Sequence, residues 1–195
     1  LLAGLASDGG LYVPEAIPQL SPAEIAGLSG LSYAALALKI MTPFVGGCFS
    51  EAELKRMIDT AYGAFRHTAV APLAQLSHDH FVLELFHGPT LAFKDFALQL
   101  VGQLLEAAMD KGKRAVVLGA TSGDTGSAAM AGCMGRAGLD IVILYPEGRP
   151  SEVQRRQMTT LDADNIHPLA VKGTFDDCQD MVKALFSDAE FRAQH

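Results

Sequence analysis

From residue 81 onward, short apolar runs alternate with segments of helical periodicity, and this alternation constrains the fold more than any other feature. The apolar runs at 115–118 and 141–145 are too short for helices and are typical of strands buried on both faces. Strands that alternate with helices form parallel βαβ units, with helices covering both faces of the sheet. The expected fold class is therefore α/β, with a three-layer αβα sheet. The helices are expected at 94–109, 124–134 and 151–161.

The same alternation continues on both sides of this segment. We expect a strand at 81–86, another at 166–171 and a final helix at 175–186. In parallel sheets, ligands bind outside the carboxyl ends of the strands. The loops that follow 81–86 and 115–118 are therefore expected at one edge of the sheet, on neighbouring βα units, and chemistry is sought there first.

The N-terminal part has a different character and is expected to be mostly helical. The sequence Ser-Pro-Ala-Glu at 21–24 is a helix-start signal. Apolar residues then recur at helical spacing over 32–44 and 50–65. We therefore expect a mostly helical N-terminal domain over residues 1–72. An α/β domain over residues 73–195 follows, and it is expected to be incomplete.

The composition excludes several classes of function. Lys and Arg total 15 against 22 Asp and Glu, and the few basic residues form no stripe of the kind that nucleic acids need. The longest apolar stretch near the start, 25–38, is interrupted by Gly and Ser and is too short to span a bilayer. We expect neither a nucleic-acid partner nor a membrane partner.

The cysteines and histidines form no metal-binding pattern. Cys48, Cys133 and Cys178 are odd in number and widely spaced, so they match neither a zinc motif nor a disulfide framework. The histidines are scattered and lack the spacing of metal ligands. We predict no metal site, and a reducing compartment, which we take to be the cytoplasm.

One candidate site follows the expected strand at 81–86. The segment reads His87-Gly-Pro-Thr-Leu-Ala-Phe-Lys94 and leads into the next helix. Lys94 lies at the positive end of that helix and beside Phe93 and Phe96, and both surroundings disfavour the charged ammonium. A lysine that loses its proton easily is a nucleophile that can form an imine with a carbonyl. The alternative is a solvated lysine in the first turn of a surface helix.

A second candidate site follows the strand at 115–118 and reads Gly119-Ala-Thr-Ser-Gly-Asp-Thr-Gly126. Small residues let a ligand approach the backbone, and hydroxyls with free N–H groups at a helix N-terminus form an anion site. The Gly-Lys-Ser/Thr ending of a P-loop and the Gly-x-Gly pair of a dinucleotide fingerprint are both missing. The alternative is a helix cap, in which Ser122, Asp124 or Thr125 satisfies backbone donors without a ligand.

Together, an amine and an oxyanion cradle at one sheet edge suit an amino-acid substrate on a carbonyl cofactor. The segment from Glu84 to Asp95 resembles the pyridoxal 5'-phosphate (PLP) attachment site of the fold-type-II, tryptophan synthase β-like PLP enzymes. Within that group it is most similar to the threonine synthase family. The turn from Thr121 to Gly126 resembles the substrate-carboxylate loop of that family. Further similar stretches lie at 8–14, 145–151, 157–160 and 173–179.

This resemblance implies roles for individual residues. Lys94 would form the Schiff base with PLP and would then act as the base that moves the Cα and Cβ protons. Phe93 and Asp124 would complete the cofactor contacts. Asp124 stands where many fold-type-II enzymes have an Asn whose amide contacts the cofactor's 3′-oxygen, and an Asp there is common in threonine synthases. The substrate carboxylate would be held by Thr121, Ser122, Gly123 and Thr125.

The implied activity is that of a PLP-dependent carbon–oxygen lyase, which converts O-phospho-L-homoserine and water to L-threonine and phosphate. Candidates for binding the substrate's phosphate are Arg149, Ser151, Arg155 and Lys113, each weighed against a plain solvated surface residue. Two alternatives stay open. One is a related PLP-dependent phospholyase or hydroxyamino-acid dehydratase, and the other is a non-catalytic fragment of the same fold.

The sequence also lacks one expected part of such an enzyme. The family's glycine-rich loop for the cofactor phosphate has no counterpart after residue 126. We therefore expect this chain to be the N-terminal portion of the enzyme, with the cofactor-phosphate loop outside it. The oligomeric state is left open, with a monomer among the alternatives.

Overall fold

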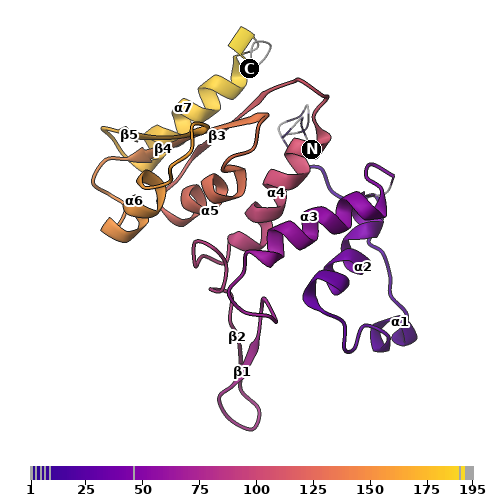
Figure 1. Ribbon diagram of the computed structural model, residues 1–195. Coiled ribbons are helices and arrows are strands. Elements are labelled where there is room, and N and C mark those ends of the chain that lie inside the picture. The colour runs from indigo at the N-terminus through magenta and orange to yellow at the C-terminus, as the bar shows by residue number, and fades with distance from the viewer. Residues whose placement is uncertain are drawn as a thin grey trace. The chain divides into compact units, whose positions relative to one another are not determined.

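The computed structural model describes residues 2, 4, 6, 8, 10–45, 47–188, 190 and 191 (Figure 1). The chain forms two compact units, Leu1–Glu84 and Leu85–His195. Gly9 of the motif at 8–14 and residues 189 and 192–195 of the expected α/β domain lie outside the described residues. The expected domain boundary between residues 72 and 73 stays a prediction.

The first unit is built on helices, as its sequence predicts. The helices are α1 (Pro22–Ala26), α2 (Tyr33–Val45) and α3 (Glu51–Gly63). Helix α3 buries residues at the i, i+3 and i+4 spacing of one helical face. In its last turn, the ring of Tyr62 meets the ring of Tyr33 from α2 edge-on, with 4.9 Å between centroids. The buried face of α3 consists of Leu54, Met57, Ile58, Ala61 and Tyr62.

The expected strand at 81–86 is shorter than predicted and belongs to a different sheet. Strand β2 (Phe81–Leu83) pairs antiparallel with β1 (Leu73–Gln75), a strand that the sequence analysis did not predict. The turn between them is closed by the Leu76 N–H, which donates to the His80 carbonyl at 2.9 Å. The expectation that 81–86 joins the parallel sheet was wrong. An apolar run predicts a strand but does not determine which strand it pairs with. Pairing with a segment that is only a short loop away has the lowest cost in loop-closure entropy.

The second unit contains the parallel sheet. Its strands are β3 (Ala115–Ala120), β4 (Leu139–Pro146) and β5 (Ile166–Val171), in the order β3-β4-β5, with Ala115 opposite Leu139 and Ile141 opposite Ile166. The α/β fold class is confirmed. None of the described helices combines the length and apolar character needed to cross a bilayer. The helices of this unit are α4 (Asp95–Ala108), α5 (Asp124–Cys133), α6 (Glu152–Thr159) and α7 (Phe175–Ser187).

The core of this unit lies on the central strand β4. Its alternate residues Leu139, Ile141, Ile143 and Tyr145 are buried on one face, where α5 and α6 cover them. Helix α7 packs on β3 and β4, and Figure 1 shows it on the side of the sheet away from α5. This is the three-layer arrangement that the alternating pattern predicts. It places the loop after β3 at the carboxyl edge of the sheet.

Helices α4 and α5 approach each other unusually closely, and two glycines allow it. A Cβ atom on Gly102 of α4 would overlap the carbonyl oxygen of Gly132 in α5. A Cβ atom on Gly132 would overlap the carbonyl oxygen of Leu98 in α4. Because both obstacles are backbone, the two helices could accept a side chain at either position only by moving apart. The contact therefore sets the spacing between α4 and the C-terminal part of α5.

We predict that Gly132→Ala lowers the thermal unfolding midpoint of the intact protein. The added methyl group forces α4 and α5 apart, at a cost of about 1–3 kcal/mol for overpacking. The matched control is Gly63→Ala at the end of α3, where a Cβ atom meets nothing within 4 Å. The control should leave the midpoint unchanged or slightly raised. Equal midpoints for the two variants would contradict the close packing.

Candidate functional site

The loop at 119–126, here called the glycine loop, leaves β3 and enters α5. Thr121 is buried at its centre. The Thr121 hydroxyl accepts the N–H groups of Gly123 at 3.0 Å and Gly126 at 2.9 Å, and it donates to the Gly123 carbonyl at 3.1 Å. The Thr121 N–H donates to the Leu144 carbonyl of β4. The polar donors of Thr121 are thus engaged inside the protein, and the residue fixes the shape of the loop.

Other groups in the glycine loop are available to a ligand. The backbone N–H groups of Ser122, Asp124 and Thr125 have no acceptor among the described residues. The hydroxyls of Ser122 and Thr125 are exposed and likewise make no hydrogen bond within that part of the chain. Unsatisfied N–H groups at the start of a ten-residue helix carry a partial positive charge and bind anions. The loop can therefore bind a carboxylate with donors that the fold leaves unused.

The loop at 87–94, here called the lysine loop, is held by a buried carboxylate. Asp95, the first residue of α4, is fully buried. It accepts hydrogen bonds from the Thr90 N–H at 2.9 Å, the Thr90 hydroxyl at 2.9 Å and the Gln99 side-chain amide at 3.0 Å. A Cβ atom on Gly88 would overlap the Asp95 side chain, so this turn requires glycine. Asp95 therefore determines the path of the loop that ends at Lys94.

Lys94 lies at the N-terminal boundary of α4, with a half-buried side chain. Its Nζ atom is 4.4 Å from the centroid of the Phe93 ring. Among the described residues, Nζ forms neither a hydrogen bond nor an ion pair. Leu91, three residues earlier, has φ +66°, a left-handed conformation that costs a side-chain-bearing residue about 1–2 kcal/mol. The lysine loop thus keeps a strained turn and presents an amine that contacts the Phe93 ring but has no hydrogen bond or ion pair in the described part of the chain.

Three side-chain amides connect the two loops. Gln99 in α4 donates to Asp95 and also to the Ala128 carbonyl of α5 at 3.2 Å. From α6, Gln157 donates to the Thr90 carbonyl at 2.9 Å, and Gln154 donates to the Asp124 carboxylate at 2.8 Å. Both loops therefore belong to one hydrogen-bonded structure within the second unit. Sequence reasoning missed these residues, although the Ser-x-x-Gln spacing at 151–154 is a capping-box signal that marks Gln154.

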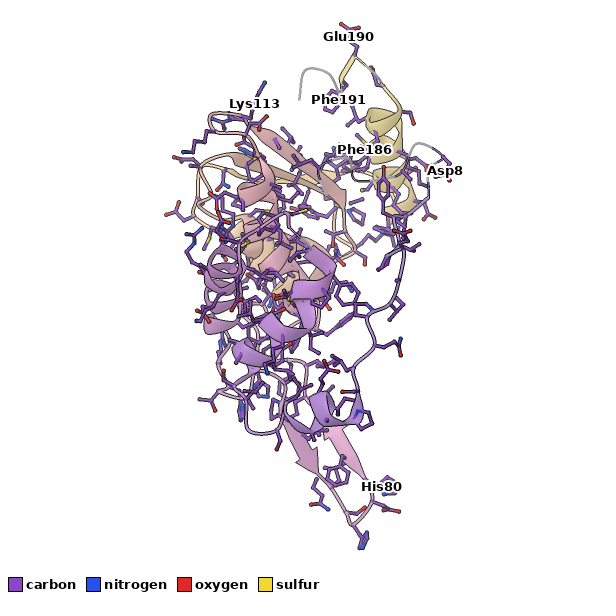
Figure 2. All side chains as sticks on the ribbon, turned by 90° about the vertical axis from the view of Figure 1, so that its right-hand side faces the viewer. Asp8, His80, Lys113, Phe186, Glu190 and Phe191 are labelled. Carbon is purple, nitrogen blue, oxygen red and sulfur yellow. The ribbon has the colours of Figure 1, made fainter. Side chains whose placement is uncertain are left out.

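The candidate phosphate-binding residues do not all lie near the glycine loop. Lys113 precedes β3, whereas the glycine loop follows it, so the six residues of the strand separate them by about 20 Å. Figure 2 shows Lys113 at the outer edge of the second unit. Ser151 caps α6 beside Gln154, and its hydroxyl accepts the Gln154 N–H at 3.3 Å. The side chain of Arg149 is exposed and has no partner among the described residues.

Arg155 is engaged in an ion pair on the surface of α6. Arg155 and Arg156 both bind Glu152, at 2.9 and 2.8 Å. Their hydrogen bonds lower the pKa of the Glu152 carboxyl to about 2. Arg155 could bind a phosphate only by exchanging this partner.

Metal binding finds no support in the part of the chain that the structure describes, where no three His, Cys, Asp or Glu side chains gather closely enough to hold an ion. The three cysteines are unpaired, with Cys133 and Cys178 buried as packing residues. Burial raises the pKa of the Cys133 thiol above its ordinary value. The polar groups of the site are an amine, hydroxyls, amides, backbone N–H groups and the carboxylates of Asp95 and Asp124.

Two family models match the chain. The model described as "Threonine synthase N terminus" matches residues 1–62, and the model described as "Pyridoxal-phosphate dependent enzyme" matches residues 62–193. The second match extends over more than half of the sequence. The chain belongs to the pyridoxal-phosphate dependent enzyme family, which the resemblance of the lysine loop indicated.

Individual relatives show which pyridoxal-phosphate dependent enzymes this chain is similar to. A threonine synthase from Pseudomonas aeruginosa is 59% identical over 192 residues, which is 98% of this chain and 41% of the relative. One from Saccharomyces cerevisiae is 46% identical over 210 residues, which is 100% of this chain and 41% of the relative. The crystal structure of PLP-bound threonine synthase from Brucella melitensis has a TM-score of 0.92 at 53% identity, over 97% of this chain and 41% of that one. The fold-type-II expectation is confirmed. The chain spans about two fifths of the length of these relatives.

We predict that Asp95→Asn destabilises the protein by about 1–3 kcal/mol, because an amide has one acceptor oxygen where the carboxylate has two, so a buried donor of Thr90 or Gln99 loses its partner. Hydrogen exchange at the amides of 88–95 and the thermal unfolding midpoint measure the effect. The matched control is Asp59→Asn, which removes an exposed ion pair with Lys55 and should cost no more than about 0.5 kcal/mol. If the two variants unfolded at the same temperature, Asp95 would not hold the lysine loop.

Proposed function

We propose that the intact protein is a PLP-dependent threonine synthase, and that this chain supplies its lysine and its substrate-carboxylate loop. The observation that carries the proposal is the pairing of the two loops. An amine without a hydrogen bond or ion pair among the described residues lies at the start of α4, and a set of unused anion donors lies at the start of the tightly packed α5. Relatives named threonine synthase share this chain at up to 59% identity, which supports the same reading.

The residues of the two loops fit PLP as a cofactor. The Lys94 amine is available to hold the aldehyde end of the cofactor, with the Phe93 ring beside it. Asp124 has one carboxylate oxygen, Oδ2, without a partner among the described residues, so it is available to accept a hydrogen bond from the cofactor's 3′-hydroxyl. When bound, PLP supplies an electron sink for negative charge at the substrate carbons. Nζ of Lys94 then moves protons at Cα and Cβ of the substrate.

The substrate carboxylate would be bound by the unused donors of the glycine loop. The hydroxyls of Ser122 and Thr125 and the backbone N–H groups of 122, 124 and 125 are the groups available for direct contacts. Thr121 and Gly123 would act differently, because the Thr121 hydroxyl and the Gly123 N–H already bind each other. We therefore propose that Thr121 and Gly123 shape the cradle and that Ser122 and Thr125 touch the substrate.

The proposed reaction converts O-phospho-L-homoserine and water to L-threonine and phosphate. Arg149 and Ser151 are the best candidates for binding the substrate's phosphate. The Arg149 side chain and the Ser151 hydroxyl proton donate no hydrogen bond to another described residue. Arg155 would have to release Glu152 first. The three unpaired cysteines fit a reducing compartment, and we propose the cytoplasm.

We predict that Lys94→Ala abolishes the lysine-dependent visible absorbance of PLP in the intact protein and lowers phosphate release at least about 10³-fold, because the group that moves protons is lost. Circular dichroism checks that the variant is folded. Lys113→Ala is the matched control and should keep both the absorbance and the activity, since Lys113 lies at the other end of β3. Absence of the absorbance band in the wild-type protein loaded with PLP would overturn the proposed function.

We predict that the intact protein releases phosphate from O-phospho-L-homoserine in a one-to-one ratio with L-threonine and releases no ammonia. Parallel assays for phosphate, threonine and ammonia separate this activity from its alternatives. Ammonia release from a hydroxyamino acid would identify a dehydratase. Phosphate release from a different phosphorylated amine would identify another phospholyase. Absence of turnover with the lysine band intact would indicate a non-catalytic member of the fold.

A further inference from the structure

Helix α6 begins differently from the other capped helices of this chain. Capping boxes, in which the N-cap and N3 side chains bind each other's backbone N–H groups, start α1, α3, α6 and α7 in the described part of the chain. Three of them use a carboxylate at N3, and only α6 uses an amide. The N3 residues are Glu24, Glu53, Gln154 and Asp177.

The amide of Gln154 also donates a hydrogen bond, which a carboxylate could not do. Its Oε1 atom accepts the Ser151 N–H at 3.0 Å, and its Nε2 atom donates to Oδ1 of Asp124 at 2.8 Å. Only one orientation of the amide satisfies both contacts, because a backbone N–H needs an acceptor and a carboxylate needs a donor. A glutamate at this position would keep the cap but would set one carboxylate against another.

The same amide lies over the glycine loop. A Cβ atom on Gly123 would come within 2.5 Å of the Gln154 side-chain amide, so the absence of a side chain at 123 makes room for Gln154. One helical turn further along α6, Gln157 reaches the lysine loop through the Thr90 carbonyl. Helix α6 therefore contacts both loops from one face, and Gln154 is the contact that reaches a residue proposed to bind the cofactor.

We propose that Gln154 is a positioning residue for Asp124. Its amide engages Oδ1 and so leaves Oδ2, which has no partner among the described residues, to accept a hydrogen bond from the 3′-hydroxyl of PLP, which carries the shared proton. This inference rests on the proposed function. It adds a residue that does not itself touch the cofactor, and it explains why α6 is capped by an amide rather than by a carboxylate.

The test is a double-mutant cycle in the intact protein, with PLP as the probe. Gln154→Glu keeps the capping acceptor and adds a carboxylate beside Asp124. We expect it to raise the Kd for PLP about tenfold or more, the loss of one charge-assisted hydrogen bond, and to shift the visible absorbance band. In the Asp124→Asn background, Gln154→Glu should carry almost no penalty, because the introduced Asn amide can donate to the introduced carboxylate. In the cofactor-free protein, Gln154→Glu should likewise lower the thermal unfolding midpoint more in the wild-type background than in the Asp124→Asn background.

The matched control is Glu53→Gln, which makes the reverse exchange in the capping box of α3 and should leave the PLP Kd and the band unchanged. If Gln154→Glu does not fold, Gln154→Met removes the donor to Asp124 and the cap acceptor without adding charge, and it should raise the Kd about threefold. A Gln154 variant that lowers only the thermal midpoint, with band and Kd as in the wild type, would overturn the inference. So would an equal penalty in the wild-type and Asp124→Asn backgrounds. A wild-type protein without a Lys94-dependent band would instead overturn the proposed function.

Discussion

The buried carboxylate of Asp95 is the constraint on which the candidate site depends. A carboxylate without contact to water is costly unless its oxygens are hydrogen-bonded, and here two donors of Thr90 and one of Gln99 meet that need. The N-terminal dipole of α4 adds a favourable field. Because the two hydrogen bonds from Thr90 require a particular path for residues 88–94, they also determine the position of Lys94.

Neutral side-chain amides link the lysine loop to the glycine loop by hydrogen bonds. Gln99, Gln154 and Gln157 each join elements that are distant in the sequence, and none brings a charge into the site. The close packing of Gly102 on Gly132 sets the spacing that these amides span. In the glycine loop, the Thr121 hydroxyl takes up the N–H groups of Gly123 and Gly126, whereas those of Ser122, Asp124 and Thr125 have no acceptor among the described residues. The internal polar groups of the site are thus hydrogen-bonded to each other, whereas the groups expected to face a ligand have no hydrogen-bond partner among the described residues.

Much of this could be predicted from the sequence, and the failures have a physical pattern. Helix-start signals and periodicity together located the described helices, and apolar runs located the three parallel strands, because an apolar face must be buried whatever covers it. The same reasoning assigned Phe81–Leu83 to the parallel sheet, although the strand forms a hairpin with β1. Motif chemistry singled out Lys94 and the residues from Thr121 to Thr125 but treated Thr121 and Ser122 alike. Their hydroxyls differ in the structure, because one is buried and saturated and the other is exposed.

The sequence by itself determined the α/β class, the two loops and the membership of the family, because local periodicity and short motifs carry that information. Only the tertiary structure decided which strand pairs with which, which hydroxyls remain available, and that Gln154 and Gln157 meet the two loops from one helix. Those contacts join residues 30 and 67 positions apart in the chain. Their existence depends on how helices pack against a sheet, which no local pattern of residues encodes.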